Sequence, residues 1–147
     1  MNNKSFMLFA IKEALKSDEP LKCSVVIVKN NKIIAKAHNS QRKDTNATAH
    51  AEIKAIKKAG KKLKSKNLTG CVVYGTCEPC LMCLSALILA KVDTLFYGAT
   101  LTEYNLTDIK ITMDEVLSKS SQKLNVIKNF MEEECSQTLY RNKIVSQ

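Results

Sequence analysis

Two apolar segments joined by one helix are the feature that most constrains the fold of this chain. Residues 71–74 (CVVY) and 94–97 (TLFY) are rich in β-branched and aromatic residues, which favour strands. Residues 80–90 lie between them and have the apolar character of a buried helix. Strand, helix and strand in this order predict a parallel pair of strands joined by a right-handed crossover.

A hairpin is predicted before this unit. Residues 23–28 (CSVVIV) are almost entirely apolar and β-branched, as expected for a strand covered on both faces. Asn30 and Asn31 favour a tight turn, and residues 32–38 then form a second strand.

Helical periodicity marks two further segments, residues 5–16 and 48–60. In the second we expect Ile53 and Ile56 to face inward and Gly60 to end the helix. Residues 39–47 are polar and irregular.

The C-terminal third has a weaker pattern. It predicts a short helix at 114–118, a short strand at 124–127 and a last helix at 129–140, in which Phe130, Cys135 and Leu139 are candidate apolar contacts. The sum is a single α/β domain spanning 1–147, a three-layer α/β/α sandwich with a mixed sheet of about five strands.

The length and composition agree with one domain. A chain of 147 residues with 45% hydrophobic residues can bury one sizeable core. Its N-terminus is amphipathic and lacks the pattern of a signal peptide, and no apolar run approaches the roughly 18 residues that a membrane span needs. We expect a soluble, cytoplasmic protein.

Three of the six cysteines fall within TCEPCLMC, residues 76–83. Without an export signal, metal binding or catalysis is a better interpretation of these cysteines than disulfides. Cys80 and Cys83 are three residues apart, on one face of the predicted helix, so both sulfurs can reach one ion. The positive end of the helix dipole favours their thiolate forms.

His50 and Glu52 begin the other predicted helix, where both can border a site beyond its end. Zinc bound by two thiolates and an imidazole would lower the pKa of a water molecule from 15.7 to about 7. Cys77 is the candidate for a fourth protein ligand, which would make the site closed and structural. Pro79 disfavours helical geometry at Glu78, so we expect Cys77 to lie before the helix as a buried neighbour of an open site.

The combination His50-Ala51-Glu52 and Pro79-Cys80-Leu81-Met82-Cys83 resembles the H-x-E…P-C-x-x-C signature of the zinc-dependent cytidine and adenosine deaminase superfamily. Residues 25–99 are similar to the core of bacterial tRNA adenosine deaminases and guanine deaminases. Glu133-Glu134-Cys135 is similar to the C-terminal part of the tRNA enzymes.

The resemblance implies specific roles. His50, Cys80 and Cys83 would bind one Zn²⁺, and Glu52 would carry protons between water, a ring nitrogen and the leaving amine. Asn39, eleven residues before His50, would hydrogen-bond the base, and the backbone of Ala51 would approach the ring. His38 is more typical of a packing residue. The resemblance also implies a homodimer.

The substrate is less constrained than the chemistry. A formal charge of +9 and the lysine run at 54–66 favour a polyanion such as tRNA, although the same lysines suit the solvated face of a helix. Residues 100–108 differ from the Gly- and Ser-containing segment of the tRNA enzymes. Ser24 and Val25 replace smaller residues and are expected to narrow the base pocket.

Three functions follow. The first is a tRNA-specific adenosine deaminase that forms inosine at the wobble position. The second is a deaminase of a free base or nucleoside such as guanine or cytosine. The third is a structural zinc domain without catalytic activity.

Overall fold

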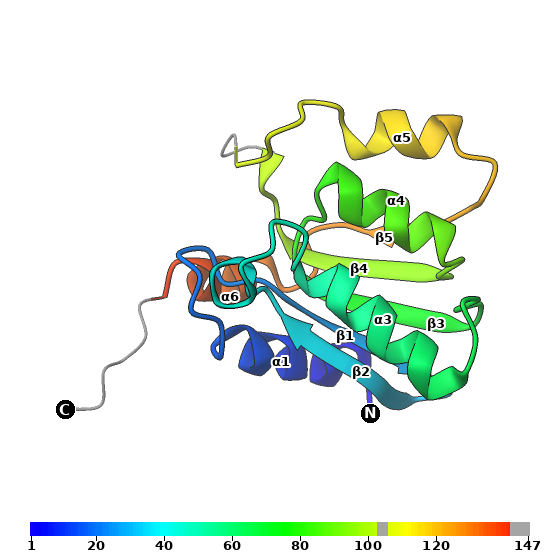
Figure 1. The fold of residues 1–147 in the computed structure, drawn as a ribbon, viewed down its shortest axis with the longest axis horizontal. Helices are drawn as coiled ribbons and strands as arrows, with labels where there is room; N and C mark the ends of the chain where they lie inside the picture. Colours follow the sequence, from blue (N-terminus) through cyan, green and yellow to red (C-terminus); the bar gives the residue numbers. More distant parts are fainter. Residues whose placement is uncertain (103–105, 142–147) are drawn as a thin grey trace.

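A computed structural model describes residues 1–102 and 106–141. Within them, a five-stranded sheet has the order β2-β1-β3-β4-β5 (Figure 1). Its strands are β1 (Ser24–Lys29), β2 (Lys32–His38), β3 (Cys71–Cys77), β4 (Thr94–Ala99) and β5 (Asn125–Ile127). The pairs β1·β2 and β1·β3 are antiparallel, whereas β3·β4 and β4·β5 are parallel, which confirms the mixed sheet.

The hairpin turns at Asn30 and Asn31, whose φ angles are 49° and 60°. Two successive left-handed residues match the right-handed twist of the flanking strands, and asparagine tolerates this conformation better than most residues. The strand before the turn is buried on both faces, as its composition predicts: every residue of β1 except Lys29 is buried.

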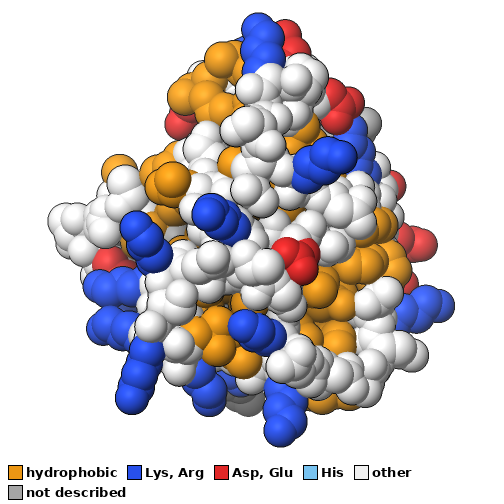
Figure 2. Space-filling view, turned by 90° about the vertical axis from the view of Figure 1, so that its right-hand side faces the viewer, with side chains coloured by type: hydrophobic (Ala, Val, Ile, Leu, Met, Phe, Trp, Pro, Cys, Tyr) orange, Lys and Arg blue, Asp and Glu red, His pale blue; other side chains and the backbone are white. Residues whose placement is uncertain are grey.

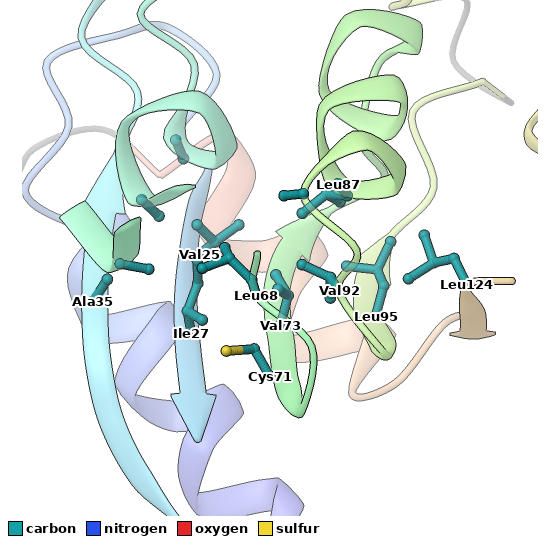
Figure 3. Packing of buried hydrophobic residues seen from close by; sticks show 14 of the residues in the cluster. Val25, Ile27, Ala35, Leu68, Cys71, Val73, Leu87, Val92, Leu95 and Leu124 are labelled. Carbon is teal, nitrogen blue, oxygen red and sulfur yellow. The ribbon is translucent and has the colours of Figure 1, made fainter. Parts of the chain in front are cut away.

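Helices cover both faces of the sheet (Figure 1). On one face, α3 (Ala51–Leu63) and α4 (Leu81–Leu89) pack over alternate strand residues that include Val25, Ile27 and Val73 (Figure 3), and α5 (Met113–Lys119) lies beyond α4 (Figure 1). On the other face, α1 (Asn3–Ala14) and α6 (Glu132–Leu139) pack over Val26, Val28 and Tyr74. The three-layer α/β/α architecture is therefore confirmed.

A row of aromatic rings runs through the α1/α6 layer. The ring of Tyr74 on β3 lies 5.3 Å from Phe6 of α1 and 4.9 Å from Phe96 of β4, and Phe96 lies 5.1 Å from Phe130. These separations are those of favourable aromatic pairs. Cys135 and Leu139 of α6 are fully buried beside them, so the apolar contacts predicted for the last helix are confirmed.

The prediction that Gly60 ends its helix is wrong. Helix α3 continues to Leu63 and ends at Lys64, which takes the left-handed conformation with a φ of 53°. Of the two residues expected to face inward, Ile56 is half-buried and packs against the core, and Ile53 is half-buried; the fully covered residues of α3 include Ala51, Ala55 and Ala59. Small side chains let this helix approach the sheet closely.

The segment 39–47 is not wholly irregular, because it contains the one-turn helix α2 (Gln41–Asp44). In the part of the chain described by the structure, no helix combines the length and apolarity needed to cross a membrane.

Candidate active site

His50 and Cys80 occupy equivalent positions at the starts of two neighbouring helices. His50 is the N-cap of α3 and Cys80 is the N-cap of α4, and both have extended backbone conformations. Neither side chain caps its own helix, although N-cap side chains commonly do so. Both are therefore free to serve a site beyond the helix ends, where the two positive dipole ends favour anionic groups.

Cys83 lies one turn into α4 and completes the cluster. Its Sγ atom lies 3.5 Å from Nδ1 of His50, and Sγ of Cys80 lies 3.6 Å from the same nitrogen. All three atoms lie within 4.8 Å of one another. Tetrahedral zinc with bonds of about 2.0–2.3 Å places neighbouring nitrogen and sulfur ligands roughly 3.5 Å apart. The donor set and its spacing fit zinc.

The proton affinities of the three groups are strongly coupled. A hydrogen bond from Cys83, aided by one from His50, lowers the pKa of Cys80 to about 4 despite partial burial. The same contacts with Cys80 raise the pKa of Cys83 and of His50. Hydrogen bonds within the cluster thus favour the thiolate form of Cys80, which is the form that binds a metal ion.

Glu52 lies in the first turn of α3, with only 7% of its surface exposed. Burial raises the pKa of its carboxyl group, and a hydrogen bond with Cys83 opposes this effect. Glu52 is not part of the ligand cluster but lies beside it. A carboxyl group with a raised pKa next to a metal site suits proton transfer near neutral pH.

Cys77 takes a different role from the ones predicted for it. It is disulfide-bonded to Cys23, with the two Cα atoms 5.8 Å apart, so the expectation of no disulfides is wrong for this pair. Cys77 also packs in the cluster beneath α1 and α6, on the opposite face of the sheet from the metal ligands. It therefore cannot supply a fourth ligand, and the closed structural zinc site loses its only candidate.

Asn39 lies at the end of β2 and is buried, but its carboxamide is engaged within the protein. Oδ1 accepts hydrogen bonds from the Ser17 hydroxyl and the Cys23 backbone, and Nδ2 donates to the carbonyl oxygen of Leu21. A role in base binding stays a prediction for Asn39. His38 faces away from the cluster, with Nδ1 3.0 Å from Oε1 of Glu13 in α1.

Ala51 is the first residue of α3 and is 1% exposed, between the ligand His50 and Glu52. Its predicted backbone approach to the base is also untested. Of the two residues expected to narrow the pocket, Ser24 directs its hydroxyl to the carbonyl oxygen of Ala10 in α1. Val25 points to the opposite face and packs with the core beneath α3 and α4.

A sequence profile of the cytidine and deoxycytidylate deaminase zinc-binding region matches residues 1–99. The chain belongs to this deaminase family. Its catalytic class and its fold are those of a zinc-binding hydrolytic deaminase of nucleobases or nucleosides, and His50, Cys80 and Cys83 are positioned to bind a metal.

Curated relatives of this deaminase include two kinds of enzyme. The chain is 42% identical over 101 residues to the tRNA-specific adenosine deaminase of Aquifex aeolicus, covering 67% of each protein. It is 33% identical over 132 residues to the Bacillus subtilis tRNA-specific adenosine deaminase, covering 88% of this chain and 81% of that one. Guanine deaminase of B. subtilis is 45% identical over 78 residues, covering 53% of this chain and 50% of the relative.

Solved structures include members of the same two groups. A structure from a study of A-to-I editing by tRNA:A34 deaminases at the wobble position has a TM-score of 0.82 and 29% identity to this deaminase, covering 93% of this chain and all of that one. The B. subtilis guanine deaminase structure has a TM-score of 0.68 and 32% identity, covering 80% and 90%.

The structure also identifies two side chains, Lys54 and Glu78, that hold segments near the site by hydrogen bonds and to which the sequence pattern assigned no such structural role. Lys54 of α3 donates to the carbonyl oxygen of His38 and to the Ser40 hydroxyl, at 2.8 and 2.7 Å, and so fixes the segment that carries Asn39. Glu78, between Cys77 and the metal-binding helix, binds the chain just after β4. Their partners are distant in sequence and follow no motif, so only the folded structure reveals these contacts.

Proposed function

We propose that this deaminase converts adenosine to inosine at the wobble position of transfer RNA. The observation that carries the proposal is the extent of the likeness to the tRNA:A34 deaminase structure, which covers all of that chain with a TM-score of 0.82. The curated tRNA-specific relatives likewise align beyond the metal motifs, over as much as 94% of this chain.

The reaction replaces the exocyclic amine of adenine with oxygen. A bond forms between water oxygen and C6, and the C6–N bond breaks with release of ammonia. Zinc held by His50, Cys80 and Cys83 would supply the Lewis acidity that makes water nucleophilic at neutral pH. Glu52 accepts the water proton and delivers protons to the ring nitrogen and then to the departing amine.

The environment of these groups supports the roles assigned to the zinc cluster and to Glu52. Burial of Glu52 raises its pKa and so makes its protonated form accessible, which a proton donor to the leaving amine requires. The N-termini of α3 and α4 both carry residues of the candidate zinc cluster, so their dipoles favour negative charge at that place. Asn39 and the backbone of Ala51 are proposed to orient the base.

Deamination of a free base such as guanine is the second candidate. It is favoured by the similarity to guanine deaminase, which is 45% identical over 78 residues. Loops around a pocket decide such specificity more than the catalytic groups do.

One experiment separates the two candidates. Zinc-loaded protein is incubated with an anticodon stem-loop carrying a wobble adenosine and, in parallel, with free guanine, cytosine, adenine and their nucleosides. Inosine in the stem-loop, found by nuclease digestion and mass spectrometry, supports the tRNA function. Ammonia release from small molecules alone would replace it with the second candidate, and an adenosine-to-guanosine substitution in the stem-loop is the matched control.

The lysine run is only partly available to an RNA. Lys58 donates to the carbonyl oxygen of Lys36, and Lys54 is bound as described above. Other lysines of the run line a groove between α3 and α4, namely Lys57, Lys61, Lys64 and Lys66. RNA contact by this run stays a prediction.

We also propose a homodimer in which this groove is covered by a second copy. Its apolar lining includes Ile56, Leu68 and Leu89, and Leu89 is 84% exposed. Figure 2 shows a face of the molecule on which hydrophobic side chains lie between basic ones.

Paired copies would bring lysines together, so the dimer should strengthen as salt increases. Light scattering of wild-type protein and Leu89→Glu at two salt concentrations tests this, and a monomeric wild type would refute it.

A further inference from the structure

Glu78 joins the metal-binding turn to the end of β4. It follows the last residue of β3, precedes Pro79 and the ligand Cys80, and is 8% exposed. Its backbone N–H donates to the carbonyl oxygen of Ala99 at 2.7 Å. This contact places the turn that carries Cys80 directly beside the point where the chain leaves β4.

The side chain of Glu78 makes a second and more extensive connection. Oε2 accepts hydrogen bonds from the backbone N–H groups of Leu101 and Thr102, at 3.1 and 2.9 Å. Oε1 accepts a hydrogen bond from the Thr102 hydroxyl at 2.6 Å. The partners of this nearly buried carboxylate thus come from two consecutive residues 23 and 24 positions further along the chain.

Side chains from residues 107–116 border the start of α4. A small hollow beside the site is lined by Glu78, Cys80 and Leu81 on one side and by Thr102, Ile109 and Met113 on another. Ile109 and Ile111 are each 52% exposed there. The described residues of this stretch therefore form a partly apolar wall next to Cys80.

We propose that Glu78 is a positioning residue that sets this wall for the nucleobase substrate. Its carboxylate touches neither the ligand cluster nor the reacting atoms but fixes Leu101 and Thr102 relative to Cys80. The inference rests on the proposed function in that the substrate carries a nucleobase. Loss of the Glu78 carboxylate should weaken substrate binding while leaving the zinc ligands and Glu52 in place.

The alternative is that Glu78 only stabilises the fold, and the two roles have different kinetic signatures. A positioning role predicts that Glu78→Ala raises KM about tenfold or more while kcat changes by less than about threefold, because two or three hydrogen bonds to a charged group are lost. Glu78→Gln keeps an acceptor for the two N–H groups and presents an amide to the Thr102 hydroxyl, so it should restore KM to near the wild-type value.

Two further variants sharpen the comparison. Thr102→Val removes only the hydroxyl bond and should raise KM less than Glu78→Ala does; it also provides a test should Glu78→Ala fail to fold. Glu132→Ala is the matched control, because Glu132 is an exposed carboxylate in the first turn of α6, which packs on the other face of the sheet from the Cys80 turn. Its KM should equal that of the wild type.

The hydrogen bonds from Leu101 and Thr102 to Glu78 can also be tested without an activity assay. Hydrogen exchange at the amides of Leu101 and Thr102 should accelerate at least tenfold in Glu78→Ala, with one zinc per chain retained. Unchanged exchange overturns the inference, as does loss of zinc or a fall in kcat at constant KM. The tRNA function is tested with the wild-type protein alone. The role of Glu78 is tested by the ratio of the variant's KM to the wild-type KM, measured with whichever base the wild-type protein deaminates.

Discussion

At the scale of single residues, the site depends on where two helices begin. His50 and Cys80 are both N-cap residues, so their side chains project beyond the helix ends instead of along a helix face. Glu52, two residues after His50, can then border the same space, which it could not do in mid-helix. The sequence motif is short because the helix starts provide the geometry.

Replacing Glu52 with glutamine should abolish proton transfer but leave the metal site intact. We expect kcat to fall by about 10²–10⁴-fold, the usual contribution of general acid–base catalysis, with one zinc per chain by metal analysis. Glu132→Gln, at an exposed position in the first turn of α6, is the control and should keep wild-type turnover. Near-normal turnover of Glu52→Gln would remove Glu52 from the mechanism.

Glu13 should make the protein sensitive to acid. Burial alone would raise the pKa of its carboxyl group, but hydrogen bonds from His38 and Lys16 outweigh burial and hold the pKa below its ordinary value. The stability that this carboxylate contributes is therefore complete above its unfolded pKa and is lost as pH falls through the lower folded value.

Urea unfolding measured from pH 7 to pH 3 tests this expectation. Glu13→Gln should lower the free energy of unfolding at pH 7 by about 1–3 kcal/mol, the contribution of hydrogen bonds to a charged group. The variant should also lose less stability than the wild type as the solution is acidified. Parallel pH curves for the two proteins would contradict the assignment.

The gathering of His50, Cys80 and Cys83 into one cluster was predictable, because residue type and spacing are local properties of the sequence. The environment of Asn39 was not, since its three partners come from Ser17, Leu21 and Cys23. The Cys23–Cys77 disulfide was missed for the same reason: it joins residues 54 positions apart, which only the pairing of β1 with β3 brings together.

At the scale of elements, the pattern of apolar residues located every strand and all helices except α2. Their ends were less certain, since Gly60 looked like a helix stop but lies inside α3, and β3 and β4 extend beyond their apolar runs to Cys77 and Ala99. Helix ends depend on which backbone groups find partners, and strand ends depend on neighbouring strands, so neither is a property of one segment.

The packing of α6 on β4 requires a glycine at position 98. A Cβ atom on Gly98 would overlap Sγ and Cβ of Cys135 and come within 3.2 Å of the carbonyl oxygen of Phe130. Gly98→Ala should therefore lower the free energy of unfolding by about 1–3 kcal/mol, as overpacking typically does.

Gly75→Ala is a suitable control in a neighbouring strand. Its added Cβ would meet atoms at 3.4 Å or more, which are ordinary contacts. Urea unfolding of both variants should show a clear loss only for Gly98→Ala. An equal loss in both would attribute the effect to strand glycines in general and not to the contact with Cys135.

At the scale of the whole molecule, the metal ligands come from parts of the chain 30 and 33 residues apart. They meet only when α3 and α4 are packed on the same face of the sheet, so the unfolded chain cannot bind zinc in the same way. Metal binding and folding should therefore be thermodynamically coupled.

Removing zinc should lower the melting temperature. At free zinc about 1,000-fold above its dissociation constant, binding adds about 4 kcal/mol to stability, which corresponds to roughly 8–16 °C for a domain of this size. Calorimetry before and after chelation measures the shift, and Cys83→Ser should be insensitive to chelator. A wild-type melting temperature that chelation does not change would show that zinc is not bound to the folded protein.

The Asn30–Asn31 turn has a practical consequence for anyone who labels or immobilises this enzyme. Lys29, just before the turn, pairs with Lys32 and with Cys71, the first residue of β3. The turn that carries Cys80 follows Cys77, at the opposite end of β3. Both asparagines are exposed, so a peptide epitope or fluorophore attached there would point away from the entrance to the site. The hairpin tip therefore offers an attachment point at which a substrate and a reporter need not compete for space.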